Sequence, residues 1–171
     1  IALTVDLQGA GGTGLIGYSA RPHAPLIDME KINHYDPVDF WEPIYAGTGT
    51  ESGLVLNPDD FYILASREAV SVPPDHAAEM VAYDTLVGEF RVHYAGFFDP
   101  GFGWAEAGGK GTRAVLEVRS HDVPFLLEHG QTVGRLVYER LTNSPDRIYG
   151  EDIGSNYQKQ TLALAKQFRR G

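Results

Sequence analysis

The feature that most constrains the fold of this chain is the frequency of turn-forming residues. Twenty glycines and ten prolines interrupt its 171 residues, and short runs rich in β-branched and aromatic side chains lie between them. Short runs of this kind bounded by turn formers are typical of strands in an all-β protein. We expect strands over residues 2–7, 14–19, 25–28, 53–56, 60–66, 68–72, 79–83, 90–95, 113–119, 123–128 and 133–140.

Helical periodicity is scarce by comparison. The best helical pattern covers residues 155–168, where Ser155 is a suitable N-cap and Leu162, Ala165 and Phe168 recur along one side. Segment 36–44 has two prolines among aromatic residues and predicts an ordered, extended connection. We therefore predict an all-β domain with one short C-terminal helix.

The size and composition fit one globular domain over residues 1–171. The apolar fraction of 43% and the charged fraction of 22% are ordinary for a folded domain with a sizeable core. The chain starts at Ile1, inside a predicted strand and without an initiator methionine. We expect it to be part of a longer protein.

The net charge and the cysteine content limit the classes of binding partner and the cellular location that we expect. The net charge of −9 argues against a nucleic acid polymer or an anionic membrane, which need a basic face, but leaves a nucleotide open. The chain has no cysteine, no apolar run near the roughly 20 residues that span a bilayer, and no signal peptide pattern. These features favour a cytoplasmic location.

Several familiar motifs fail on their context. GAGGTG at 9–14 has the spacing of a dinucleotide fingerprint, but a proline-broken, strand-like segment follows where a helix is required, so a hairpin turn is the better interpretation. The six histidines show no metal-ligand spacing, and the zinc deaminase pattern needs cysteines that this chain lacks. No serine lies in a G-x-S-x-G nucleophile elbow.

Glu117 stands out because it interrupts the apolar stretch AVLEV at 114–118. In an extended strand it shares one face with Arg113, Val115 and Arg119, while the apolar residues between them point the other way. Two interpretations remain open. The pattern alone favours a polar outer face with weak neighbouring charge pairs, and the alternative is the acid of an active site.

A family resemblance changes this balance. Asp99-Pro100-Gly101, then VLEV, then DVPFLLEHGQTVGRLVYERL, followed by NYQKQ at 156–160, resemble in order and spacing the core of bacterial dCTP deaminases, which belong to the dUTPase-like superfamily. The resemblance covers roughly residues 54–168. The segment before it is similar to double-length bacterial members, and the chain resembles their C-terminal half.

This resemblance implies a distorted β-barrel or β-clip fold and a trimer-like homo-oligomer with active sites at its interfaces, joined to a missing N-terminal half. It also implies hydrolytic deamination of dCTP to dUTP and ammonia without zinc. Glu117 would be the general acid/base, which requires a carboxylate held near both water and base with a pKa raised by burial.

The resemblance assigns further residues to the nucleotide. Backbone groups of Ala95 and Gly96 would contact the pyrimidine edge, and Asp99 would lie near the sugar. The triphosphate, with Mg²⁺ on its oxygens, would face three side chains near the C-terminus: Tyr157, Lys159 and Gln160.

The chain departs from the family in one loop. Asp84-Thr85 stands where the family has Ser-Ser, and no arginine follows at the family spacing. The second half of a double-length protein would then supply this loop. The alternatives are a non-catalytic half that serves assembly or regulatory nucleotide binding, a dUTPase, whose arginine-led C-terminal arm has no counterpart in 155–171, and an unrelated β-sandwich.

Overall fold

The computed structural model describes residues 1–9, 12–47, 53–82, 90–93, 96–104, 110–120, 122–149, 162 and 164–170, with the backbone alone for residues 82 and 90–93. Strands dominate this part of the chain, as predicted. In order, the elements are β1 (Ala2–Thr4), β2 (Leu15–Ala20), the 3₁₀ helix η1 (Pro37–Asp39), β3 (Trp41–Tyr45), β4 (Gly53–Leu56), β5 (Phe61–Val70), β6 (His76–Ala82), β7 (Phe90–His93), β8 (Phe97–Phe98), β9 (Thr112–Ser120), β10 (Phe125–Glu128) and β11 (Thr132–Arg140).

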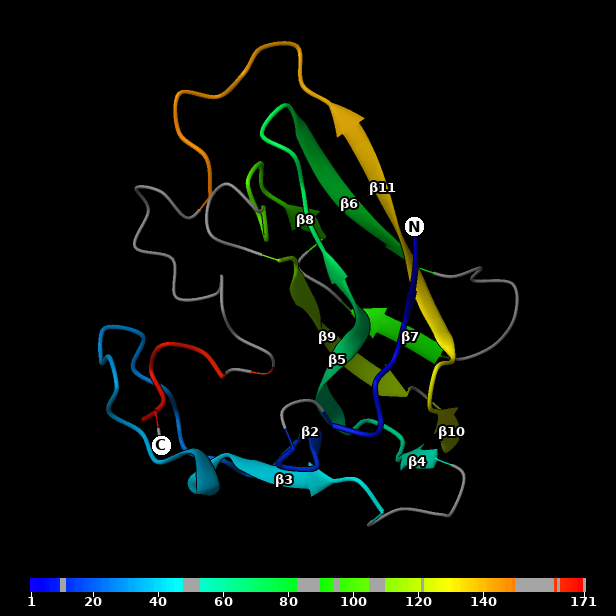
Figure 1. Cartoon of the computed structure of the whole chain (residues 1–171). Coiled ribbons are helices and arrows are strands. Elements are labelled where there is room, and N and C mark those ends of the chain that lie inside the picture. The colour runs from blue at the N-terminus through cyan, green and yellow to red at the C-terminus, as the bar shows by residue number, and fades with distance from the viewer. Residues whose placement is uncertain are drawn as a thin grey trace.

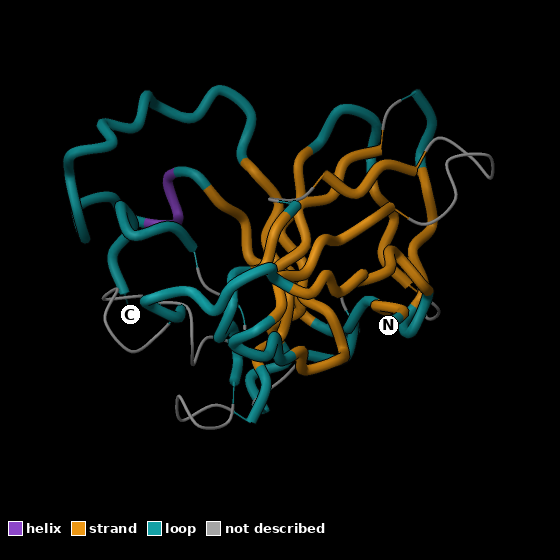
Figure 2. The backbone as a smooth tube through the Cα atoms, turned by 90° about the horizontal axis from the view of Figure 1, so that it is seen from above, coloured by secondary structure: helices purple, strands orange, loops and turns teal. Residues whose placement is uncertain are grey.

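The strands form three antiparallel sheets. The order is β3-β2-β5-β9-β7 in a five-stranded sheet, β1-β11-β6-β8 in a four-stranded sheet, and β10-β4 in a two-stranded sheet. In Figure 1 the long strands β6 and β11 rise above the crossing of β5, β7 and β9, and β2 and β3 lie below it. In Figure 2 the loop segments extend beyond the strands on the side of the C-terminus.

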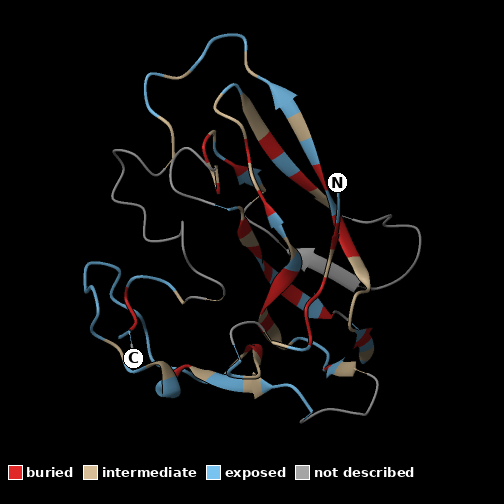
Figure 3. Ribbon diagram, in the orientation of Figure 1, coloured by how far each residue is buried: buried red, intermediate tan, exposed pale blue. Residues whose placement is uncertain are grey.

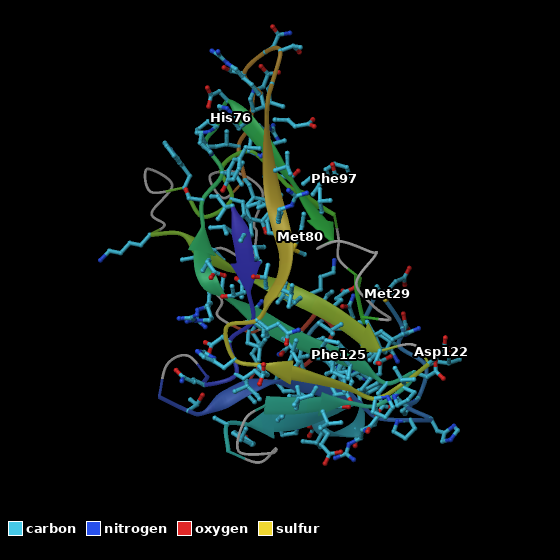
Figure 4. The ribbon with its side chains drawn as sticks, turned by 90° about the vertical axis from the view of Figure 1, so that its right-hand side faces the viewer. Met29, His76, Met80, Phe97, Asp122 and Phe125 are labelled. Carbon is cyan, nitrogen blue, oxygen red and sulfur yellow. The ribbon has the colours of Figure 1, made fainter. Side chains whose placement is uncertain are left out.

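One hydrophobic core joins the sheets. Alternate strand residues point into it, so that Leu64 from β5, Leu116 from β9 and Leu136 from β11 have 0–1% of their surface exposed. Leu127 of β10 and Met80 of β6 are buried in the same cluster. In Figure 4 Met80 lies between Phe97 of β8 above it and Phe125 of β10 below it. The core therefore explains why apolar alternation predicted most of the strands correctly.

The predicted strands 60–66 and 68–72 are one strand, β5, that passes through an irregularity. The register with β9 shifts between Ala65 and Ala69, so three β5 residues bulge out opposite Ala114. Ser66 bridges this bulge, because its hydroxyl donates to Glu68 O and accepts from Ala114 N. The bulge keeps the strand continuous and carries Arg67 and Glu68 away from the ladder.

Two predicted elements are wrong. Residues 25–28 lie in an exposed loop rather than a strand. The C-terminal helix expected over 155–168 is not formed by the described part of that range, where 164–168 runs beside 33–35 and Phe168 forms a parallel bridge with Tyr35. The backbones of the two segments exchange hydrogen bonds. Asn33 N donates to Lys166 O at 2.9 Å, and Arg169 N donates to Tyr35 O at 2.8 Å. Hydrogen bonds to a distant segment replace the local helical ones.

Segment 36–44 is extended at its C-terminal part, as expected. Asp36 caps η1 through a hydrogen bond from Val38 N, and the chain then enters β3 at Trp41. Phe40 between them packs edge-on against Phe168 with ring centroids 5.3 Å apart. No helix in the described residues has the length and apolar character needed to cross a membrane.

Candidate functional site

Glu117 lies on the exposed face of β9. Along this strand buried and exposed residues alternate, and Leu116 and Val118 on either side of Glu117 are fully buried. Figure 3 shows the alternation as bands along β9. Glu117 is therefore exposed among the described residues, although both of its neighbours along the strand lie in the core.

The positions of Glu117's neighbours follow from the strand registers. Glu117 is paired with Ile63 on β5 and with His93 on β7, and Ile63 is paired in turn with Tyr18 on β2. Residues directly opposite each other in antiparallel strands share a face, with Cα atoms about 4.5–5.5 Å apart. Glu117 therefore stands in a row that crosses the five-stranded sheet, with half-buried Tyr18 and Ile63 on one side of it.

The next row places a cation near this face. Arg119 is paired with Phe61, and its guanidinium carbon lies 5.6 Å from the centroid of the Phe61 ring. This distance fits a cation–π contact, which holds Arg119 over the β5 side of the sheet. Burial, together with the nearby Tyr45 hydroxyl, raises the pKa of Tyr18, so Tyr18 stays a neutral hydrogen-bonding group on this face.

Gly96 follows closely after the strand that pairs with Glu117. Gly96 is three positions after His93, so their Cα atoms are at most about 11 Å apart and Gly96 lies within about 16 Å of Glu117. The Gly96 carbonyl accepts a hydrogen bond from Met80 N at 3.0 Å. The Gly96 carbonyl is thus tied to β6, with one of its lone pairs already engaged.

Asp99 begins a tight turn after β8. Its carbonyl accepts from Phe102 N, and Gly101 N donates to Val72 O at the end of β5. Gly101 has φ +92°, and a Cβ there would lie 2.9 Å from Tyr149 O, so only glycine fits without strain. The Asp99 side chain is exposed, and among the described residues nothing links it to Glu117.

The remaining predicted ligand residues lie outside the described residues. These are Ala95, Tyr157, Lys159 and Gln160, and the same holds for Asp84 and Thr85 of the divergent loop. Within the described ranges no three His, Asp or Glu side chains are grouped so that they would hold a metal ion.

The structure also shows a polar pocket that the sequence analysis missed. It has a volume of about 380 Å³ and is lined by Asp6, Gln8, Arg67, Glu68, Arg113 and His129. It forms where the segment after β1, the β5 bulge, the start of β9 and the turn between β10 and β11 meet. The available signal was Asp6 in ALTVDL, an acid inside an apolar run like Glu117 in AVLEV.

Among the described residues, Asp6 is the one acidic side chain that is buried, with 5% of its surface exposed. Its carboxylate accepts hydrogen bonds from the Arg113 guanidinium and from Gln8 N, the latter at 2.9 Å. Burial alone would raise the pKa of Asp6, but these bonds outweigh it and hold the pKa below its ordinary value of 3.8. Asp6 is therefore an anion at neutral pH, neutralised by Arg113.

Glu68 is held in a similar way. Its two carboxylate oxygens accept from Thr4 N at 2.7 Å and from the Thr4 hydroxyl at 2.6 Å. Burial acts to raise the pKa of Glu68, yet the Thr4 hydrogen bonds lower it below the ordinary 4.5. Both pocket acids thus serve to fix the β1 segment against β5 and β9.

Comparison with known proteins identifies relatives over most of the chain. Residues 1–168 match the family "2'-deoxycytidine 5'-triphosphate deaminase (DCD), C-terminal domain". A "dCTP deaminase, dUMP-forming" of Halobacterium salinarum is 34% identical over 154 residues, which are 84% of this chain and 74% of that protein. A "dCTP deaminase" of Natronomonas pharaonis is 31% identical over 134 residues, 77% of this chain and 64% of that protein.

A solved structure is more similar still. The crystal structure of 2'-deoxycytidine 5'-triphosphate deaminase from Agrobacterium tumefaciens is 61% identical, with a TM-score of 0.77 over 85% of this chain. This chain spans 43% of the length of that one. The family match, the identity and the shared fold agree with the resemblance seen in the sequence, and the chain belongs to the dCTP deaminase family, in the part described as the C-terminal domain.

Proposed function

We propose that this chain contributes the general acid/base, Glu117, to the hydrolytic deamination of dCTP. Glu117 takes a proton from a water molecule, whose oxygen adds to C4 of cytosine. Glu117 passes this proton to ring nitrogen N3, which keeps it in the product. It then carries the second proton, from the new C4 hydroxyl, to the departing amine as the C4=O bond forms and the C4–N bond breaks. The products are dUTP and ammonia, and neither zinc nor a covalent intermediate is required.

One observation carries this proposal. The registers place Trp41, Pro43, Tyr18, Ile63 and the alternate β9 residues Val115, Glu117 and Arg119 on a common outer face, and Glu117 is the single carboxylate among the described strand positions there. Glu117 stands on β9, next to the edge strand β7, from which the chain leads to Gly96 and Asp99. A planar base laid on this face would meet one acid and no competing one.

Covering this face is a necessary part of the proposal. A general base at neutral pH needs a pKa raised by removal from water, and Glu117 is exposed in the chain alone. We propose that 1–171 is one dUTPase-like, barrel-shaped domain of a longer cytoplasmic protein. A second domain or a neighbouring copy in a trimer-like assembly then closes over Glu117 and brings the loop that Asp84-Thr85 replaces here.

The same assembly would complete the nucleotide site. Backbone groups of Ala95 and Gly96 would read the pyrimidine edge, and Asp99 would contact the sugar. The triphosphate would lie against Tyr157, Lys159 and Gln160, with Mg²⁺ bound by the phosphate oxygens rather than by a protein cage. Gly96 follows β7, which pairs with the Glu117 strand, and Asp99 follows the short strand β8, and this order supports the arrangement.

Substitution of Glu117 by Gln in the full-length protein tests the proposal. The amide keeps the size of the side chain but cannot accept the proton from water. Ammonia release should fall by a factor of about 10² to 10⁴, the range for loss of a general base, while dCTP affinity measured by calorimetry stays within a few-fold. Wild-type rates of ammonia release would refute the role of Glu117.

A second product deserves a test because the Halobacterium relative is named as dUMP-forming. Formation of dUMP would need a second hydrolysis, of the bond between the α- and β-phosphates, with release of pyrophosphate. Separating the nucleotide products after complete turnover distinguishes the two. We expect dUTP, and accumulation of dUMP with one pyrophosphate per ammonia would replace this part of the proposal.

The exposure of Glu117 in the single chain favours one alternative, a non-catalytic domain that serves assembly or regulatory nucleotide binding. Calorimetric titration of the full-length protein and its Glu117→Gln variant with dCTP and Mg²⁺ separates the two functions. A deaminase site predicts tight binding of dCTP together with loss of turnover in the variant. An assembly domain predicts unchanged turnover, because the chemistry would lie elsewhere.

A further inference from the structure

We propose that the pocket of Asp6, Gln8, Arg67, Glu68, Arg113 and His129 is a binding site for a phosphate-type oxyanion. The pocket lies at the junction of four chain segments, the one after β1, the β5 bulge, the start of β9 and the turn between β10 and β11. Arg113 and Glu117 share a face of β9 and are four residues, about 13 Å, apart along the strand. The site is therefore distinct from Glu117 and stands independently of the deaminase proposal.

The acids of the pocket are already engaged with the protein. Each oxygen of Glu68 accepts a hydrogen bond from Thr4, and the oxygens of Asp6 accept from Arg113 and from Gln8 N. These bonds lower the pKa values of both carboxyl groups below their ordinary values, so both groups are anions held by the fold at neutral pH. The carboxylates are therefore poor ligands for an added cation.

The hydrogen-bond donors of the pocket, in contrast, are not all engaged within the described residues. Arg67 is exposed, and no described residue lies within hydrogen-bond or ion-pair distance of its guanidinium. A Cβ built on Gly130 would lie 3.0 Å from Arg67 Nη1, so this guanidinium lies against the turn that carries His129. A planar guanidinium presents a fork of N–H donors that fits phosphate oxygens.

His129 adds a second donor. Leu7 N donates to His129 Nδ1 at 3.0 Å, so Nδ1 carries a lone pair and the ring proton lies on Nε2. The 3.6 Å approach of Nδ1 to the Asp6 carboxylate is accordingly no ion pair. Within the described residues neither Nε2–H of His129 nor the Arg67 guanidinium forms a hydrogen bond. With the remaining N–H groups of Arg113 and the NH2 of Gln8, they give the pocket several donors for an oxyanion.

Calorimetric titration of the full-length protein tests the site with two ligands, inorganic phosphate and dCTP. The test variant is Arg67→Gln, which removes the free cation but no described hydrogen bond, and the control is Arg135→Gln, an exposed strand arginine in another sheet. We expect Arg67→Gln to weaken binding about tenfold or more and Arg135→Gln to leave it unchanged. His129→Asn, which keeps an acceptor for Leu7 N, should weaken binding as well.

The ligands identify the source of the oxyanion. Weakened binding of inorganic phosphate indicates a site for the free anion, and weakened binding of dCTP alone indicates a site for a phosphate of the nucleotide. Equal affinity of wild type and Arg67→Gln for both ligands would overturn the proposal. The Glu117→Gln variant should bind inorganic phosphate like the wild type, so failure of this site and failure of the deaminase proposal are told apart.

Discussion

The Arg113 guanidinium forms an ion pair with the buried carboxylate of Asp6, which ties the start of β9 to the segment after β1. Arg113 has its aliphatic stem on the same strand face as Glu117, four residues away. The pair thus anchors the strand on which the proposed acid/base stands.

Asp6→Asn should destabilise the protein strongly. Asparagine can still accept from Gln8 N, but it leaves the partly buried Arg113 guanidinium without its counter-charge, and breaking such a pair costs about 3 kcal/mol. Urea unfolding measures the loss. Asp146→Asn, at an exposed position, is the control and should change the free energy of unfolding by less than about 0.5 kcal/mol. Equal stability of the two variants would show that the pair contributes nothing.

Acid should destabilise the wild type more than the Glu68→Gln variant. The pKa of Glu68 lies below 4.5 in the folded state, so the unfolded chain binds more protons there than the folded one. The stabilisation by Glu68 is thus present above pH 4.5 and is lost as the pH falls through the lower folded value. Urea unfolding between pH 6 and about pH 3 checks this. Parallel pH profiles for the two proteins would contradict it.

Gly101→Ala should disturb the turn that carries Asp99. The substitution imposes positive φ on an alanine and places its Cβ 2.9 Å from Tyr149 O, at a cost of about 2 kcal/mol. Gly12→Ala is the matched control, because Gly12 has φ +77° and nothing within 4 Å of the added Cβ. Thermal unfolding should show a clearly larger loss for Gly101→Ala. A loss no larger than that of Gly12→Ala would mean that the turn relaxes.

Much of the fold could be predicted from local pattern. Alternation placed β4, β9 and β11 within one or two residues, because each strand has one face in the core. The β5 bulge split one strand into two predictions, since Ser66 substitutes its side chain for a missing ladder bond. No local signal reveals such a contact.

The helix prediction for the C-terminal segment was wrong for a different reason. Its helical spacing is real, but Phe168 is buried against Phe40 and Tyr35, residues more than a hundred positions away in the chain. Gln167 is also buried and donates to Met29 O at 3.1 Å. Long-range packing and hydrogen bonds override a weak local propensity for helix.

The candidate site was only partly predictable for a related reason. Glu117 and Asp6 carry the same signal, an acid within an apolar run, yet Glu117 is exposed and Asp6 is buried. Alternation fixes which way a strand residue points, but what covers that face depends on segments distant in the chain or on other chains. Arg113 is the partner that distinguishes the two acids, and its approach to Asp6 spans 107 residues of sequence.

The most direct test of the central claim is single-turnover ammonia release from dCTP by the full-length Glu117→Gln variant, with enzyme in excess. This measurement excludes product release, and Glu79→Gln, an exposed acid on β6, serves as the control. The account predicts that Glu117→Gln slows ammonia release by a factor of about 10² or more while Glu79→Gln reacts like the wild type. Equal single-turnover rates for both variants would show that Glu117 does not transfer the proton.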